Sequence, residues 1–190
     1  MPDFTISRGE IVAIVGPSVT GKTTFVDVLA GLHIPLTGKA YINDSPLDQT
    51  ANKYLNFGYV TQKASLRSGT VANLLRRSGY DDAEMAHAMN MFELQEIPLE
   101  HVIGENARNL SGGQTKRINL LHSIGAADHI KIFDESFNAI DPNQRMRVFD
   151  AMRALAPDLT GIVITHDPDI SERCDRVYRF KDNQLVTVDK

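Results

Sequence analysis

The segment Gly16–Thr23, with the sequence GPSVTGKT, restricts the fold of this chain more than any other. It fits the pattern G-x-x-x-x-G-K-[ST], and it lies between the β-branched run Ile11–Val15 and a segment with apolar residues at helical spacing. A strand, a glycine-rich turn and a helix in this order direct backbone N–H groups at an anion, and the helix N-terminus adds positive potential. The segment therefore predicts a phosphate-binding loop in an α/β domain.

Two side chains of this loop are expected to act on a nucleotide. Lys22 would neutralise the β- and γ-phosphates, and the Thr23 hydroxyl would hold Mg²⁺. The alternative is a chance match in an ordinary glycine turn, and the strand and helix on either side argue against it. The residues expected to bind nucleotide are Gly16, Ser18, Val19, Thr20, Gly21, Lys22, Thr23 and Thr24.

A second apolar run, Ile130–Phe133, ends in two carboxylates, Asp134 and Glu135. P-loop enzymes place an acid that holds Mg²⁺ at the end of such a strand, so Asp134 is the candidate for this role. Glu135 points the other way and is a candidate to position or polarise the attacking water. The alternative is that the two carboxylates cap a helix or lie on the surface without a catalytic role. The presence of a phosphate-binding loop in the same chain argues against this alternative. Because Lys131 interrupts the apolar run, we also expect one face of this strand to be less buried than usual.

Composition limits the remaining function classes. The chain has 190 residues, 42% of them hydrophobic, which is enough for one domain with its own core. Its net charge of −4 argues against a nucleic-acid partner, because such binding works through a basic face. A single cysteine, Cys174, allows no internal disulfide and favours a reduced, cytosolic setting. The N-terminus does not read as a signal peptide, and no apolar run approaches the roughly 20 residues of a membrane helix.

The order of strand-like and helix-like segments predicts an α/β core with an inserted helical subdomain. Strands are expected over 11–15, 40–42, 57–60, 130–133, 162–165, 177–180 and 184–188, and the last two are expected to form a hairpin. Helices are expected over 23–31, 71–77, 82–92, 114–127 and 142–156. We expect a single domain over 1–190, with a catalytic core of 1–61 and 111–190 and a helical subdomain of 62–110.

A second helix N-terminus suited to phosphate follows this helical part. Ser111 can act as the N-cap, and Gly112 and Gly113 leave the first N–H groups of the helix open. A Ser-Gly-Gly cap is weak evidence alone, because most such caps are structural. The segment Leu110–Gln114, however, reads LSGGQ and resembles the signature of ABC ATPases.

The resemblance to ABC ATPases covers nearly the whole chain, and the motifs follow the order of the family. Gly16–Thr23 resembles Walker A, and Ile130–Asp134 resembles Walker B. Gln62 in YVTQ is similar to the Q-loop glutamine, and His166 in ITHD is similar to the switch histidine. Asn138–Asp141 resembles the D-loop, which is usually Ser-Ala-Leu-Asp. So many motifs in one order imply a P-loop NTPase core of the ABC type.

The resemblance also implies a role for each matched residue. The residues implied to be catalytic are Glu135, His166 and Gln62, and those implied to hold Mg²⁺ are Thr23, Gln62 and Asp134. The residues implied to complete the ATP site of a second domain, in a head-to-tail dimer, are Ser111, Gly112, Gly113 and Gln114. Asp141 would link the two sites.

The implied function is ATP hydrolysis that powers a membrane transporter, with ATP and Mg²⁺ as cofactors. The partners would be a second ABC ATPase domain, in a homo- or heterodimer, and transmembrane domains. The chain would lie on the cytoplasmic side of a membrane, peripheral or fused to a transmembrane domain. Ser68–Val71 with Asn73 resembles the SGTIxEN segment of exporters, and Ile103–Glu105 resembles their VGExG loop, although Ala107 replaces its last glycine. These segments favour the exporter branch.

One expected feature of the family is missing. The family has further strands upstream of Walker A, with an aromatic residue that stacks on adenine, and the chain offers no match for it. Phe4 is too close to the phosphate-binding loop for that role. We therefore expect either a truncated or divided domain, or an adenine that packs against another group.

Two other functions stay open at this point. One is a soluble ABC ATPase of the iron–sulfur assembly type, which the motifs do not separate from a transporter domain. The other is a regulatory subunit that binds ATP without hydrolysing it, and Glu135 and His166 argue against this alternative.

Overall fold

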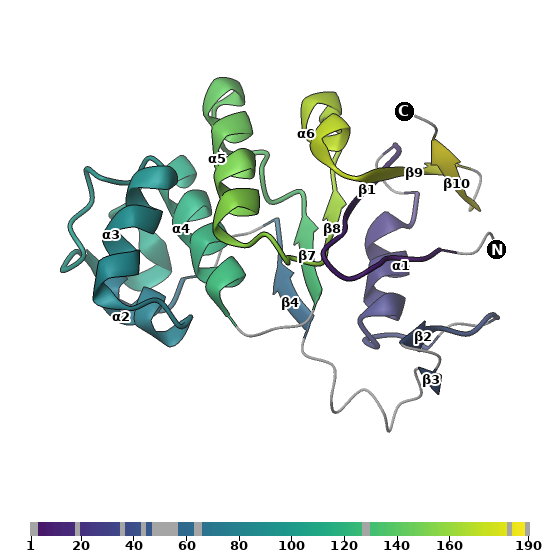
Figure 1. Cartoon of the computed structure of the whole chain (residues 1–190), viewed down its shortest axis with the longest axis horizontal. Helices are drawn as coiled ribbons and strands as arrows, with labels where there is room; N and C mark the ends of the chain where they lie inside the picture. Colours follow the sequence, from purple (N-terminus) through teal and green to yellow (C-terminus); the bar gives the residue numbers. More distant parts are fainter. Residues whose placement is uncertain are drawn as a thin grey trace.

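The computed structural model of the chain describes residues 4–17, 20–34, 37–42, 45–46, 57–62, 66–126, 130–181 and 184–188. A six-stranded sheet forms its centre, and the strands are β1 (Ile11–Val15), β4 (Phe57–Val60), β7 (Ile130–Asp134), β8 (Gly161–Ile164), β9 (Arg176–Lys181) and β10 (Gln184–Val188). Their order is β10–β9–β1–β8–β7–β4 (Figure 1). All neighbours are parallel except β10, which is antiparallel to β9. The predicted α/β fold with a mainly parallel sheet is therefore confirmed.

Helices cover both faces of this sheet, which explains why its strands are nearly continuous apolar runs. The described α-helices are α1 (Lys22–Leu29), α2 (Val71–Arg77), α3 (Asp82–Met91), α4 (Gly112–Gly125), α5 (Pro142–Leu155) and α6 (Pro168–Arg173). Along β1, Val12 and Ile14 belong to a core that includes Val26 of α1. Ile11 and Ala13 point to the other face and belong to a larger core, which includes residues of α2 to α6.

Helices α2 and α3 lie beside α4, at the end of the molecule away from α1 (Figure 1). A capping box sets the start of α3, because the Asp81 carboxylate accepts hydrogen bonds from the N–H groups of Ala83 and Glu84 at 2.9 and 2.8 Å. The Glu84 carboxylate in turn accepts from the Asp81 N–H at 2.9 Å. The short elements are the antiparallel pairs β5 (Gly69–Thr70) with β6 (Val102–Ile103) and β2 (Tyr41–Ile42) with β3 (Ser45–Pro46), and a 3₁₀ helix at Glu105–Ala107.

The predicted strands and helices are all present, with small differences at their ends. Helix α4 begins at Gly112, earlier than predicted, because Ser111 caps it. The sequence patterns do not predict α6, β3, β5 or β6, because elements this short carry no periodic signal. The predicted turn at 182–183 and the predicted helix end at Ala127 lie outside the described residues.

The expectation that Lys131 leaves one face of β7 poorly buried is wrong. Lys131 is only 1% exposed, and its Nζ donates a hydrogen bond to the carbonyl oxygen of Ala126 at 2.8 Å. A buried ammonium group is tolerated when such acceptors replace water, so the lysine stem packs as part of the interior.

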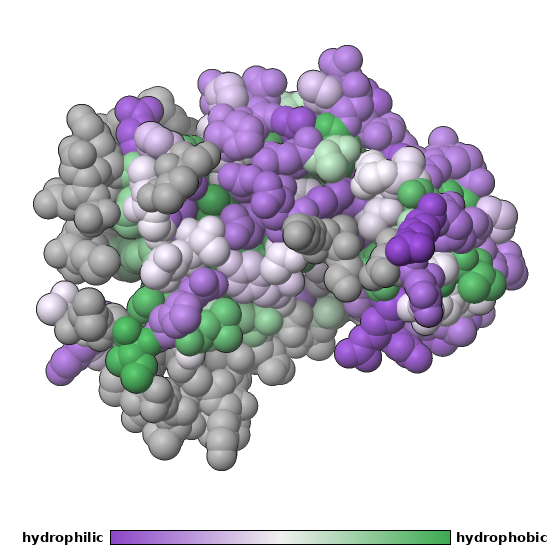
Figure 2. Space-filling view, turned by 180° about the vertical axis from the view of Figure 1, so that it is seen from behind, coloured by the Kyte–Doolittle hydropathy of each residue, from purple (hydrophilic) through white to green (hydrophobic). Residues whose placement is uncertain are grey.

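No helix in the described part of the chain is long and apolar enough to cross a membrane. Figure 2 shows the side opposite to Figure 1, where hydrophilic residues cover most of the described surface and apolar atoms form separate groups.

Candidate nucleotide-binding and hydrolysis site

The two glycines of the turn from β1 into α1, Gly16 and Gly21, have the backbone that a phosphate-binding loop requires. Gly21 is the N-cap of α1 with φ 96°, and Gly16 has φ 151°, so both lie where residues with a side chain are strained. A Cβ on Gly16 would also lie 2.6 Å from the carbonyl oxygen of Phe180. No described side chain caps α1, which leaves the N–H groups of its first turn able to bind an anion.

Lys22 lies across this loop. Its Nζ donates hydrogen bonds to the carbonyl oxygens of Gly16 at 3.0 Å and Pro17 at 2.6 Å, and the residue is 7% exposed. The Thr20 hydroxyl donates to the same Pro17 oxygen at 2.9 Å, and Thr24 is exposed in the first turn of α1. These contacts hold the cation over the loop. Two of the predicted nucleotide-binding residues, Ser18 and Val19, lie outside the described residues.

Thr23 and Asp134 are brought together at the end of β7. The Thr23 hydroxyl donates to Oδ2 of Asp134 at 3.1 Å, although the two residues are far apart in sequence. Burial raises the pKa of Asp134, and the hydrogen bond from Thr23 opposes this effect. A hydroxyl and a carboxylate side by side are the oxygen ligands that Mg²⁺ prefers, so these residues fit the predicted metal site.

Glu135 occupies a strained position directly after β7. Its φ is 48°, in the left-handed region. Its Oε2 accepts hydrogen bonds from Gln62 Nε2 at 2.9 Å and from Asn138 Nδ2 at 3.2 Å. Its Oε1 lies 3.9 Å from Nδ1 of His166, which forms an ion pair with it only when the imidazole is protonated. The three residues predicted to be catalytic are therefore neighbours in space.

The LSGGQ segment forms the start of α4. The Ser111 hydroxyl accepts from the Gln114 N–H at 3.1 Å, and the Gln114 Oε1 accepts from the Ser111 N–H at 2.8 Å, which makes a capping box. A Cβ on Gly112 would meet no atom within 4 Å, so the helix start is open there. Asp141 caps α5 by accepting from the N–H groups of Asn143 and Gln144 at 3.0 and 3.3 Å.

Comparison with known proteins identifies the family. The family model described as ABC transporter matches residues 2–138. The chain belongs to the ABC transporter family. It is 31% identical over 193 residues to an ATP-dependent lipid A-core flippase 1 of Colwellia psychrerythraea, covering 96% of this chain and 32% of that protein. It is 26% identical over 198 residues to the lipoprotein-releasing system ATP-binding protein LolD 1 of Rhodopseudomonas palustris, covering 97% of this chain and 87% of that protein.

A solved structure of a bacterial Atm1-family ABC exporter with ATP bound has the same fold, with a TM-score of 0.80 and 26% sequence identity. The match covers 96% of this chain and 34% of that chain. This ABC ATPase domain therefore spans about a third of the length of the flippases and of the exporter that it matches.

Several residues at the site of this ABC ATPase domain were not predicted. Asn138 was named only as part of the segment that resembles the D-loop, and the structure shows that its side-chain amide donates to Glu135. Burial, and then the negative charges of Asp134 and Asp27, raise the pKa of the Tyr59 hydroxyl, so Tyr59 lies close to the Asp134 carboxylate. Lys116 is buried. Helical spacing could have predicted this burial, because Lys116 lies one turn before Leu120 on the buried face of α4.

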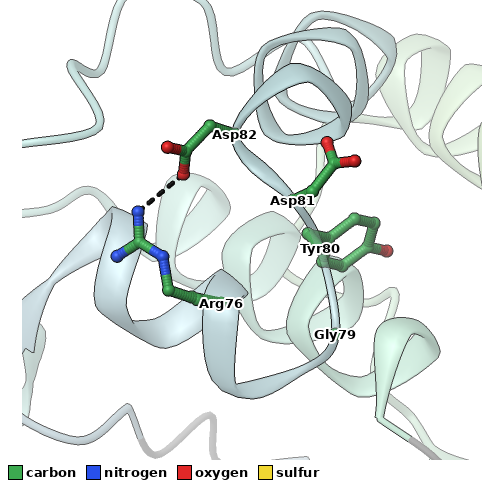
Figure 3. A pocket seen from close by; sticks show the side chains of 5 residues that line it. All are labelled: Arg76, Gly79, Tyr80, Asp81 and Asp82. Carbon is green, nitrogen blue, oxygen red and sulfur yellow. Dashed lines mark hydrogen bonds and ion pairs between the residues drawn. The ribbon is translucent and has the colours of Figure 1, made fainter.

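A hollow between α2 and α3 is lined by none of these residues (Figure 3). It has a volume of about 430 Å³ and is lined by Arg76, Gly79, Tyr80, Asp81 and Asp82. Arg76 and Asp82 form an ion pair of 2.6 Å across it, and both side chains are largely exposed. It contains none of the predicted site residues.

Proposed function

We propose that this chain is an ATP-binding and ATP-hydrolysing domain that powers an ABC transporter of the exporter type. The observation that carries the proposal is the order of functional residues along one edge of the sheet. The phosphate-binding loop follows β1, and His166 follows β8. Asp134 ends β7, Glu135 comes directly after it, and Gln62 follows β4. These four strands are adjacent and parallel, so their carboxyl ends place all these groups at one edge.

Each side chain at this edge has a task in hydrolysis. Lys22 would leave the carbonyl oxygens of Gly16 and Pro17 and bind the β- and γ-phosphates. Thr23 and Asp134 would hold Mg²⁺ together with Gln62, and the bound ion supplies charge neutralisation on the phosphate oxygens. Glu135 would orient the attacking water and accept its proton as the water oxygen bonds to the γ-phosphorus. The bond from that phosphorus to the β,γ-bridging oxygen would break in the same reaction, which leaves ADP and phosphate.

The proposed active form contains a second ABC ATPase domain. Helix α4 lies with α2 and α3, away from α1 (Figure 1), and this separation supports a signature that acts on the phosphate-binding loop of another chain. We assign residues 1–61 and 111–190 to the catalytic core and 62–110 to a helical subdomain between them. ATP would join two domains head to tail, with Ser111 of each against the γ-phosphate held by the other, and Asp141 between the sites. Release of that phosphate would open the dimer and drive transmembrane partners on the cytoplasmic side of the membrane.

The test combines turnover, assembly and partner capture. Steady-state phosphate release from Mg²⁺-ATP is measured for the parent chain and for Glu135→Gln, which is expected to be slower by about 10²-fold or more. Sedimentation with ATP is expected to show a stable dimer of Glu135→Gln, because its shared phosphate is not removed. ATP binding by the parent without turnover would instead favour a regulatory subunit. Turnover without co-purification of a membrane protein from native membranes would favour a soluble ABC ATPase.

A further inference from the structure

The buried side chain of Lys116 connects helix α4 to the residues that follow β4. Lys116 is 5% exposed, and its Nζ donates hydrogen bonds to the carbonyl oxygen of Thr61 at 3.2 Å and to that of Gln62. Thr61 and Gln62 directly follow β4, at the point where the chain leaves the sheet. Lys116 thus binds the backbone on which the Gln62 side chain is carried.

The surroundings of Lys116 explain why a charge is kept inside the protein. Burial lowers the pKa of Lys116 by removing the ammonium group from water, and the nearby Asp134 carboxylate opposes this effect. The two carbonyl oxygens replace the lost hydration. A methionine would fill nearly the same space but would supply neither hydrogen-bond donors nor charge.

Gln62 carries the connection to Glu135. Its Nε2 donates to Oε2 of Glu135 at 2.9 Å. The position of Gln62 is thus set at its backbone by Lys116 and at its side chain by Glu135. Gln62 is otherwise exposed, so loss of the backbone contact would release a side chain with considerable rotamer freedom.

We propose that Lys116 is a positioning residue that holds Gln62 against Glu135, so that the placement of the signature helix controls hydrolysis. Ser111 caps the same helix little more than one turn before Lys116. A shift of the signature against a second domain therefore moves Lys116 and the Gln62 backbone with it. This proposal rests on the proposed hydrolytic function.

The first test separates catalysis from ATP binding. Lys116→Met is expected to lower kcat for ATP by about 10- to 100-fold, the effect of a misplacement of roughly 1 Å. The KM and the calorimetric Kd for ATP are expected to stay within about twofold of the parent values. Lys116→Arg keeps the donors and the charge and is expected to recover most of the lost rate. Lys39→Met, at an exposed lysine, is the matched control and is expected to leave kcat unchanged.

A double-mutant cycle then asks whether Lys116 acts through Gln62. In a Gln62→Ala background, adding Lys116→Met is expected to change kcat by less than about twofold, because the contact is already lost. The proposal would be wrong if the kcat losses of Gln62→Ala and Lys116→Met multiplied in full in the double variant. It would also be wrong if Lys116→Met alone left kcat unchanged.

Heteronuclear NMR provides a readout that needs no turnover. The side-chain amide signal of Gln62, identified by its loss in Gln62→Ala, is expected to shift on Glu135→Gln in the parent but not in Lys116→Met. The same shift in both backgrounds would overturn the proposal. If the NMR signals shift as expected but the parent protein does not hydrolyse ATP, only the proposed hydrolytic function is contradicted. If Lys116→Met does not fold, Lys116→Gln, which is shorter and uncharged, is expected to give the same kinetic and NMR pattern.

Discussion

The side-chain amide of Asn138 lies 3.2 Å from Oε2 of Glu135, the same oxygen that accepts from Gln62 at 2.9 Å. Glu135 has φ 48°, a conformation that costs a residue with a side chain about 1–3 kcal/mol. Two amide donors from different loops hold the carboxylate in this position and leave Oε1 on the side of His166.

Removing Asn138 should therefore affect the rate of hydrolysis more than the binding of ATP. We expect Asn138→Ala to lower kcat about 10-fold, because one of two bonds that orient Glu135 is lost, with the Kd for ATP unchanged. Asn143→Ala is the control, because Asn143 is exposed in the next helix. Equal kcat values for parent and Asn138→Ala, measured by steady-state phosphate release, would show that Gln62 alone orients the carboxylate.

Lys22 is expected to supply the main charge contact with the phosphates. Lys22→Ala should weaken ATP binding by about 10- to 150-fold, which corresponds to about 1.5–3 kcal/mol for a hydrogen bond to a charged group. Isothermal titration calorimetry measures the effect, and Lys39→Ala at an exposed position serves as the control. Unchanged ATP affinity in Lys22→Ala would refute the assignment of the loop.

Asp134 should lower the stability of the free domain at neutral pH. Because burial raises its pKa, the folded chain binds more protons than the unfolded chain between the ordinary and the raised pKa, and stability falls as pH rises through this window. Asp134→Asn is expected to raise Tm by a few degrees at neutral pH without nucleotide. The gain should disappear below about pH 3.9, where the carboxyl group is protonated in both states.

The control for this prediction is Asp158→Asn, at an exposed aspartate, which should leave Tm unchanged at both pH values. A second readout is the dependence of ATP binding on Mg²⁺, which Asp134→Asn should lose. A lower Tm for Asp134→Asn at neutral pH would contradict the argument from burial.

Arg145 should be important for stability, because it joins two loops of the site. Its guanidinium forms an ion pair with Asp167, which adjoins His166, and donates to the Ile140 carbonyl oxygen at 3.0 Å. The Arg145 and Asp167 side chains are only 14% and 13% exposed. We expect Arg145→Ala to lower the free energy of unfolding by about 3 kcal/mol, because Asp167 is left without its partner.

Arg76→Ala is the matched control for Arg145→Ala. Arg76 pairs with Asp82 at 2.6 Å, but both side chains are more than half exposed, so its loss should cost at most about 1 kcal/mol. Urea denaturation measures both values, and equal losses in the two variants would refute the role given to the buried pair.

The sequence alone was sufficient for the parts of the protein whose chemistry is local. The loop Gly16–Thr23 and the acid pair that begins at the end of β7 are runs of consecutive residues, so their spacing and neighbouring segments are enough to predict them. The LSGGQ segment at α4 is also local, but its resemblance to the family signature was needed to assign it. The parallel α/β fold was predictable, because apolar strands buried on both faces alternate with helical segments.

The contacts that orient these groups were decided only by the tertiary structure. Lys116 meets Gln62, Gln62 meets Glu135, and Arg145 meets Asp167 across 22 to 73 positions of sequence. These pairs form because the sheet order sets β4 beside β7 and β7 beside β8. A local pattern does not contain that order, and it also does not tell whether a charge is buried. Lys131 was expected to mark an open face of β7 and is instead in the interior, because the carbonyl oxygen of Ala126 comes within 2.8 Å of its Nζ.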